Sequence, residues 1–252
     1  MDFNFSNSFD SRAEYPVATA AANVELVSDD DKGKVAKFNG GESYIETSID
    51  NLGFGWTVTM DIKPDAANPQ GAVLFESDKG VLKLVQDKAD NAGNGVGKLG
   101  FSKENYNHWF NYEVPADTWT TVTLTGNNAG TSLYINGEFV ERLQGNGPPG
   151  LTGADGKRYM QTLVLPTARI GGKANAFSGL LDNVNVFNKV CSDAEIAAFF
   201  DMGDVLDVNV ALNKEASASL LELHLERLQQ QYAFDGDVTT QQYRCASGCA
   251  YN

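Results

Sequence analysis

The sequence predicts an all-β fold, a two-sheet sandwich of antiparallel strands with one short helix near its C-terminal side and an irregular tail. Short segments that alternate apolar and polar residues recur along the chain, separated by Gly, Asn, Asp and Pro. Such alternation turns one face of each strand toward a core and the other toward water. With 252 residues, 42% of them hydrophobic, the chain can bury one large core and have some length left over.

The clearest predicted strand is WTVTMDI, residues 56–62. The side that we expect to face the core carries Trp56, Val58, Met60 and Ile62. The side that we expect to face solvent carries Thr57, Thr59 and Asp61. The segment TVTLT, residues 121–125, alternates in the same way with its threonines outside. We expect further strands at residues 35–38, 43–47, 72–77, 81–86, 98–102, 162–166 and 180–187.

Two local motifs predict a hairpin and a helix. Residues 131–143 read as a hairpin, because Asn136-Gly137 supplies the two positive φ angles that a type I′ turn needs. In SDAEIAAFF, residues 192–200, Ser192 and Glu195 form a capping box and Ile196 begins an apolar stripe. We expect this helix to pack against one edge of the sandwich.

An aromatic stretch at residues 105–119 contains the candidate binding residues. If residues 108–114 form a strand, Phe110 and Tyr112 point to the core with His108, and Trp109 points to the wet face. An aromatic ring among hydrogen-bonding groups suits a sugar, so we predict a carbohydrate site at Trp109, Asn107, Asn111 and Tyr106. The alternative is a Trp109 that a loop covers or that is merely a surface aromatic residue.

Charge and cysteine content exclude several classes of function. A formal net charge of −14 repels phosphate backbones, so we expect no nucleic-acid partner, and no apolar run reaches the roughly 20 residues of a membrane span. Residues 1–11 lack the regions of a signal peptide, which suits a fragment of a longer exported protein at least as well as a cytosolic one. We take the chain as such a fragment. Cys191 stands alone, and Cys245 and Cys249 predict neither a disulfide framework nor a zinc site.

Ordered motifs resemble those of a known superfamily. VAKFNGGESYIET, WTVTMDIKPD, GAVLFES, GKLGFS, TWTTVTLTG, GTSLYINGEFV, ARIGG and FSGLLDNVNVFNKVCSDAEI stand in the order found in concanavalin A-like lectins and glucanases. The chain is most similar to laminin-G-like modules of multidomain bacterial glycosidases, over roughly residues 1–203. The resemblance implies a jelly-roll sandwich and a module, outside the cell or on its surface, that binds sugars or acts as a spacer beside a catalytic domain.

A second resemblance begins after a predicted boundary near Asp204. NVALNKEASAS and QYAFDGDVTT resemble the opening of a discoidin-like carbohydrate-binding module, in which Asp235, Asp237 and Thr240 match a calcium loop. The amphipathic LLELHLERLQQQ and the ending QQYRCASGCAYN depart from that family. We therefore divide the chain into a domain at 1–203 and a linker with an incomplete discoidin-like fragment at 204–252.

The sequence favours binding over catalysis. Glycoside hydrolysis needs two carboxylates on one face of a cleft, yet the glucanase pattern Glu-x-Asp-x-x-Glu is absent and Asp61 is a lone strand acid. His108 and His224 are the only histidines, too far apart in sequence for a credible triad with Ser178 or Cys191.

The resemblance also implies a structural calcium ion where the first strand meets the last. We predict Asp182 as a ligand, with carbonyls from the first strand and from Gly41. The alternative is an Asp182 that only accepts backbone hydrogen bonds.

We therefore predict a noncatalytic module that binds or positions a glycan or polysaccharide, accessory to the catalytic domain of an extracellular glycoside hydrolase. The first alternative is a structural spacer or protein-interaction domain with no sugar site. The second is a degenerate glycoside hydrolase.

Overall fold

A computed structural model describes residues 1–13, 20–53, 55–90, 93–103, 106–127, 129–144 and 164–202. The first compact unit of the chain comprises Met1–Asp201, and its described elements are antiparallel strands and one helix. The all-β prediction is confirmed. The predicted boundary near Asp204 and all predictions for the tail lie outside the described residues.

The elements follow one another in this order. They are β1 (Asp2–Phe3), β2 (Ala20–Ala22), β3 (Val24–Asp29), β4 (Gly33–Glu46), β5 (Asn51–Leu52), β6 (Trp56–Pro64), β7 (Val73–Glu76), β8 (Val81–Lys83), β9 (Ala89–Asp90), β10 (Gly93–Asn94), β11 (Gly100–Lys103), β12 (Tyr106–Trp109), β13 (Thr120–Asn127), β14 (Gly130–Ile135), β15 (Glu138–Gln144), β16 (Leu165–Pro166), β17 (Arg169–Phe187) and α1 (Asp193–Met202).

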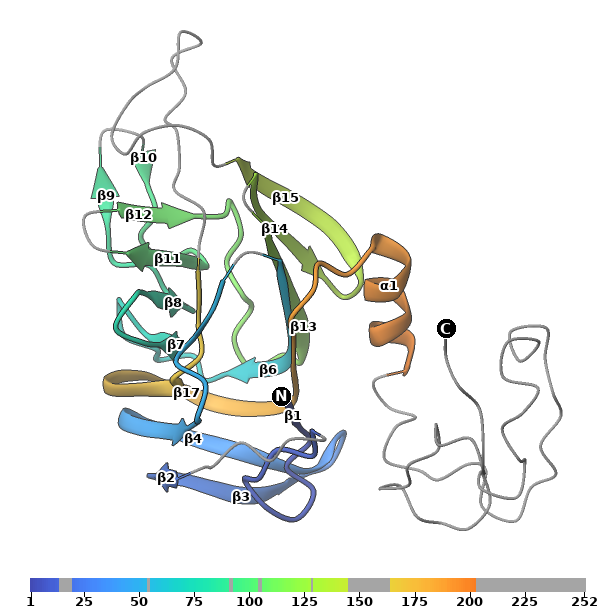
Figure 1. Cartoon of the computed structure of the whole chain (residues 1–252). Helices are drawn as coiled ribbons and strands as arrows, with labels where there is room; N and C mark the ends of the chain where they lie inside the picture. The colour runs from blue at the N-terminus through green and yellow to red at the C-terminus, as the bar shows by residue number, and fades with distance from the viewer. Residues whose placement is uncertain are drawn as a thin grey trace, which may run out of the picture. The chain divides into compact units, whose positions relative to one another are not determined.

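The two layers of the sandwich separate at the long strand β17. Along one edge, its first residues pair with β7 and its later residues with β6, while β4 pairs along the other edge. From β7 the sheet continues through β8, β11 and β12, and from β6 through β13, β14 and β15. Figure 1 shows these two branches on either side of the domain above the β4–β17 pair. The result is one large curled antiparallel sheet, consistent with a jelly roll.

The hydrophobic core lies between the two branches. Phe75, Leu82 and Phe101 come from one branch, and Val58 and Leu124 from the other, all in a single cluster of buried side chains. Alternating apolar residues thus meet face to face, as the strand pattern predicts.

The predicted hairpin and helix are confirmed. Asn136 and Gly137 have φ angles of 50° and 79° between β14 and β15. At the start of α1, the Ser192 amide donates to Glu195 Oε2 (2.9 Å), and the Glu195 amide donates to Ser192 Oγ (3.4 Å). The helix buries Ile196 in a small cluster beside β14.

The prediction that one face of β6 is exposed to solvent is wrong, because both faces of this strand are buried. Thr57 accepts a hydrogen bond from the Cys191 amide and donates one to the carbonyl of Lys189 (2.8 Å), so the segment before α1 covers it. Thr59 accepts one from Thr123, a β13 threonine that is also buried against expectation. Because each hydroxyl has a partner, burial costs these groups little.

Asp61 is buried at the same face. Its carboxylate accepts hydrogen bonds from Thr121 Oγ1 (2.6 Å) and Asn183 Nδ2 (3.0 Å), and Lys32 Nζ lies 3.4 Å away. Lys32 belongs to the β3–β4 turn, so that turn covers the C-terminal half of β6.

The aromatic segment keeps its predicted alternation but not its predicted length. The strand β12 ends at Trp109, whereas the sequence predicts a strand to residue 114. His108 and Phe110 are buried, Trp109 is half-buried and Asn111 is exposed. The Phe110 amide donates to the carbonyl of Leu99 (2.9 Å), so the segment still follows β11 after regular pairing stops.

Candidate functional site

Paired strands β11 and β12 place Trp109 on the outer face of their layer. Phe101 and His108 oppose each other on the core side, where their ring centroids are 5.2 Å apart. The register pairs Trp109 with Gly100 and Asn107 with Ser102, so these residues face away from the core.

A glycine-rich turn packs against the Trp109 indole. A Cβ atom on Gly95 would lie 2.3 Å from Trp109 Cδ2, so only glycine fits at this position, and a Cβ on Gly93 would lie 3.8 Å from Cζ2. Gly95 is held in place because its amide donates to the Lys88 carbonyl (3.1 Å) and its carbonyl accepts from the Lys98 amide (3.0 Å). The turn therefore fixes the ring and covers part of it, so Trp109 is half-buried and in part matches the alternative of a loop-covered residue.

Amide side chains lie on either side of Trp109 along the chain, Asn107 on β12 and Asn111 two residues beyond its end. Asn107 Oδ1 accepts a hydrogen bond from Ser102 Oγ (2.8 Å), and Asn111 Oδ1 accepts one from Lys98 Nζ (2.8 Å). The backbone N–H of Asn111 donates to Glu141 Oε2 (2.6 Å) on β15. The structure thus brings Trp109, Asn107 and Asn111 to one region.

Tyr106, the fourth predicted sugar-binding residue, opens the strand β12, where its backbone pairs with Lys103. Tyr106 and Trp109 are the first and last residues of this strand.

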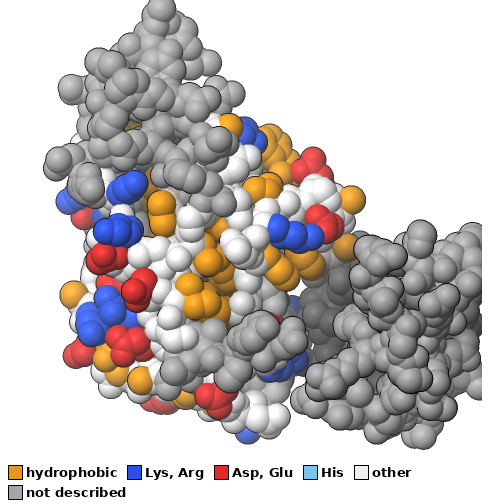
Figure 2. Space-filling view, viewed as in Figure 1, with side chains coloured by type: hydrophobic (Ala, Val, Ile, Leu, Met, Phe, Trp, Pro, Cys, Tyr) orange, Lys and Arg blue, Asp and Glu red, His pale blue; other side chains and the backbone are white. Residues whose placement is uncertain are grey.

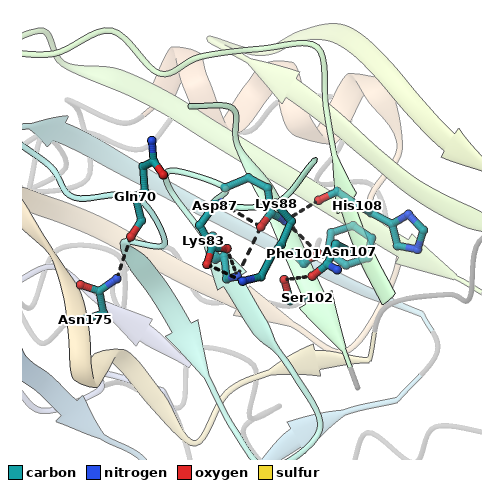
Figure 3. A network of polar contacts seen from close by, with 10 residues as sticks. Gln70, Lys83, Asp87, Lys88, Phe101, Ser102, Asn107, His108 and Asn175 are labelled. Carbon is teal, nitrogen blue, oxygen red and sulfur yellow. Dashed lines mark hydrogen bonds and ion pairs between the residues drawn. The ribbon is translucent and has the colours of Figure 1, made fainter. Parts of the chain in front are cut away.

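Beside this region lies a polar cluster that sequence reasoning missed (Figure 3). The buried Gln86 donates through Nε2 to the carbonyls of His108 (3.0 Å) and Phe101 (3.3 Å). Its Oε1 accepts from Lys83 Nζ (3.3 Å), which also lies 2.6 Å from Asp87 Oδ1. The sequence contains one signal of this cluster: Lys83 and Gln86 lie inside the apolar run VLKLVQ. Polar groups in a buried segment need hydrogen-bond partners, so these two residues indicate a polar cluster.

Two ammonium groups share the Asp87 carboxylate. Lys83 contacts Oδ1, and Lys88 Nζ lies 3.0 Å from Oδ2. Burial alone would raise the pKa of Asp87, but hydrogen bonds and attraction from both lysines outweigh it and hold the pKa below its usual value. The carboxylate therefore stays ionised as a hydrogen-bond acceptor.

The predicted calcium ligands do not converge. Gly41 pairs with Ala176, six residues before Asp182 on β17, which is roughly 20 Å at the rise of a strand. Asp182 is buried and lies opposite Asp61, where Lys32 already provides a cation. Within the described ranges, no group of three or more His, Cys, Asp or Glu residues could hold a metal ion. The pair of Asp182 and Gly41 thus does not fit a calcium site.

The residues considered for catalysis are also placed. Asp61 is enclosed by Thr121, Asn183 and Lys32, and His108 is buried on the core side of β12. Neither group is presented to a substrate, and His224 lies outside the described residues. Across the described part of the chain, no helix is long and apolar enough to cross a bilayer.

The curled antiparallel sheet with one short helix after its last strand is consistent with a concanavalin A-like jelly roll. A laminin-G-type family model, described as the concanavalin A-like lectin/glucanases superfamily, matches residues 39–197. The chain belongs to this superfamily. No curated protein matches the chain with a significant score.

Solved structures share the fold. The chain is similar to domain 4 of AbnA, a GH43 extracellular arabinanase from Geobacillus stearothermophilus, in complex with arabinotriose; the TM-score is 0.55 at 15% identity, covering 78% of this chain and 95% of that one. It is also similar to the botulinum neurotoxin serotype D binding domain, with a TM-score of 0.53 at 15% identity, covering 82% of this chain and 52% of that one.

A third similar structure is the binding domain of botulinum neurotoxin DC in complex with SialylT. Its TM-score is 0.54 at 15% identity, covering 79% of this chain and 49% of that one. The chain thus spans about half of the neurotoxin binding domains and nearly all of the arabinanase domain. At these identities the likeness shows the fold alone.

Proposed function

We propose that the chain is a noncatalytic carbohydrate-binding module whose sugar site is the outer face of β11 and β12 around Trp109. The observation that carries the proposal is the half-buried indole, fixed by Gly95 and flanked by Asn107 and Asn111. A ring face can stack on the nonpolar side of a sugar while amide groups bond its hydroxyls. The lectin-type fold supports this proposal.

The charge of the site favours a neutral glycan. Lys83, Lys88 and Lys98 are balanced by the carboxylates of Asp87, Glu113 and Glu141 in the same region. Figure 2 likewise shows basic and acidic side chains next to one another on the face of the described domain in view. The arabinanase domain carries arabinotriose in its structure, so neutral arabino-oligosaccharides are the first ligands to test.

The proposal extends to the chain's surroundings. As an accessory module it would hold an extracellular glycoside hydrolase on its polysaccharide, with the catalytic domain in the same longer protein. The superfamily and the domain of an extracellular arabinanase support this role.

A glycan array followed by calorimetric titration tests the sugar site. We expect the chain to bind neutral oligosaccharides and Trp109→Ala to weaken binding about tenfold or more, through loss of stacking and of buried ring area. Phe200→Ala is the matched control, since this exposed aromatic residue lies on α1 and not on the strands of the site. A blank array would favour the spacer, and release of sugar from polysaccharides by the purified chain would favour a hydrolase.

A further inference from the structure

Neighbouring pairs of residues form a row on the outer face of the β11 and β12 segments. These pairs are Ser102 with Asn107, Gly100 with Trp109, and Lys98 with Asn111. Positions 107, 109 and 111 alternate with the buried His108 and Phe110, so their side chains point away from the core. Residues two apart in an extended chain are about 7 Å apart, so each asparagine lies close to the indole along the row.

In both asparagine side chains, the carbonyl oxygen already has a hydrogen bond within the protein. Ser102 Oγ donates to Asn107 Oδ1 (2.8 Å), a bond drawn in Figure 3. Lys98 Nζ donates to Asn111 Oδ1 (2.8 Å). A lysine ammonium group has donors only, so this bond fixes which side of the Asn111 amide group is the oxygen. Each amide group therefore has its NH2 left to bind something else.

The groups that remain in this row are hydrogen-bond donors. Within the described ranges, neither Asn107 Nδ2 nor Asn111 Nδ2 donates to another protein group. The indole Nε1–H of Trp109, which can only donate, has no acceptor there either. Asn111 is exposed and Asn107 is half-buried, so a ligand on the outer face can reach their donors. A ligand that binds along this row must therefore supply acceptors.

We propose that Asn107 and Asn111 give the sugar site a preference for acetylated glycans, whose acetyl carbonyls accept hydrogen bonds from the two Nδ2 groups. This inference rests on the proposed sugar-binding function and adds the chemical class of the ligand. A carbonyl oxygen accepts two hydrogen bonds and donates none, whereas a hydroxyl must turn its hydrogen away from a row of donors. The acetyl methyl group is apolar and can pack on the Trp109 ring, and an acetyl group leaves the glycan neutral.

The test compares matched glycans with and without acetyl groups. Oligosaccharides of acetylated xylan and acetylated glucomannan are titrated calorimetrically beside their saponified forms, and chitotriose is titrated beside cellotriose. We expect the wild type to bind the acetylated member of a pair about tenfold more tightly, as one additional hydrogen bond would produce. Both members of each pair are neutral, so a difference in charge does not contribute.

Aspartate substitutions isolate the two donors. Asn107→Asp and Asn111→Asp keep an oxygen for Ser102 and Lys98 and replace only the NH2 by an acceptor of similar size. Each variant should lose most of the roughly tenfold preference for the acetylated glycan. Asn188→Asp is the matched control, because it adds the same charge at an exposed position after β17 and should leave the preference unchanged.

The outcomes separate this inference from the proposed function, and thermal unfolding verifies that every variant is folded. A wild type that binds saponified glycans as tightly as acetylated ones, or only glycans without acetyl groups, overturns the acetyl preference. Folded Asn107→Asp and Asn111→Asp that both keep the preference overturn it as well. In each of these cases, weaker binding by Trp109→Ala leaves the sugar site standing. A wild type that binds none of these glycans, nor any on the array, overturns both.

Discussion

Two adjacent aromatic residues, Trp109 and Phe110, occupy opposite environments. Phe110 is fully buried in the core, whereas Trp109 is half-buried against Gly95. We expect Phe110→Ala to lower the free energy of unfolding by about 3–5 kcal/mol and Trp109→Ala by much less. Urea unfolding measures both. An equal loss at the two positions would contradict the assignment of faces on which the sugar site depends.

Tyr134 gives a pH dependence at the residue scale. Burial, and then the hydrogen bond to Asp193 Oδ1 (2.7 Å), raise its pKa to about 12. Since the folded pKa lies above the unfolded value of about 10, the stability from this phenol is present below pH 10 and is lost as the pH rises toward 12. An ultraviolet titration of tyrosinate should show a late-titrating tyrosine that Tyr134→Phe removes; a last tyrosine that titrates near 10 would refute it.

The calcium prediction stays open for Asp182 alone. If this carboxylate binds calcium with carbonyls of the first strand, a hundredfold excess over Kd should stabilise the fold by about 2.7 kcal/mol. Chelation would then lower Tm by several degrees, and Asp182→Ala would abolish the difference. A melting curve that neither chelator nor millimolar calcium changes would leave Asp182 as a hydrogen-bond acceptor beside Asp61.

Residue patterns predicted one side of the site and missed the other. The alternation along 107–111 correctly separated Trp109 from Phe110, because neighbouring positions of an extended chain face opposite ways. The approach of Gly71, Asp87 and Asn175 to one another could not be predicted, since they are far apart in sequence and only strand pairing brings them together. The buried Asp61 was missed for the same reason, as its cover comes from Lys32 on a distant turn.

At the scale of elements, the helix start offers a direct test. Glu195 accepts hydrogen bonds from Lys189 and from Ser192, which lower its pKa to about 2. We expect Ser192→Ala to cost about 1 kcal/mol, because an unpaired amide is left at the N-terminus of α1. Chemical denaturation measures this loss, and Ser192→Asp, which retains a capping oxygen, should restore most of it. No loss in the alanine variant would show that the capping box does not stabilise α1.

Elements with strong local signals were predicted, and those defined by distant partners were not. The hairpin at Asn136 and the helix after Ser192 follow from turn and capping chemistry within a few residues. The short strands β2, β9 and β10 have no comparable local pattern, and the division of β17 between β6 and β7 depends on strands about 100 residues earlier.

At the scale of the whole molecule, the boundary near Asp204 stays a prediction. The described unit Met1–Asp201 contains a closed core, so a fragment of residues 1–203 should fold alone. Its Tm should match that of the full chain within about 2 °C, as expected if the remainder adds less than about 1 kcal/mol. A fragment that is unfolded, or much less stable, would place the boundary elsewhere.

The position of β17 in the chain bears on how the protein is made. This strand joins both branches and pairs with β1, where the Met1 amino group donates to the Val186 carbonyl (2.9 Å), yet it begins only at Arg169. A ribosome therefore releases the strands that β17 connects well before β17 itself. Nascent chains arrested before residue 169 should remain protease-sensitive and prone to aggregation through their unpaired edges, whereas those that have released residues beyond 187 should become resistant.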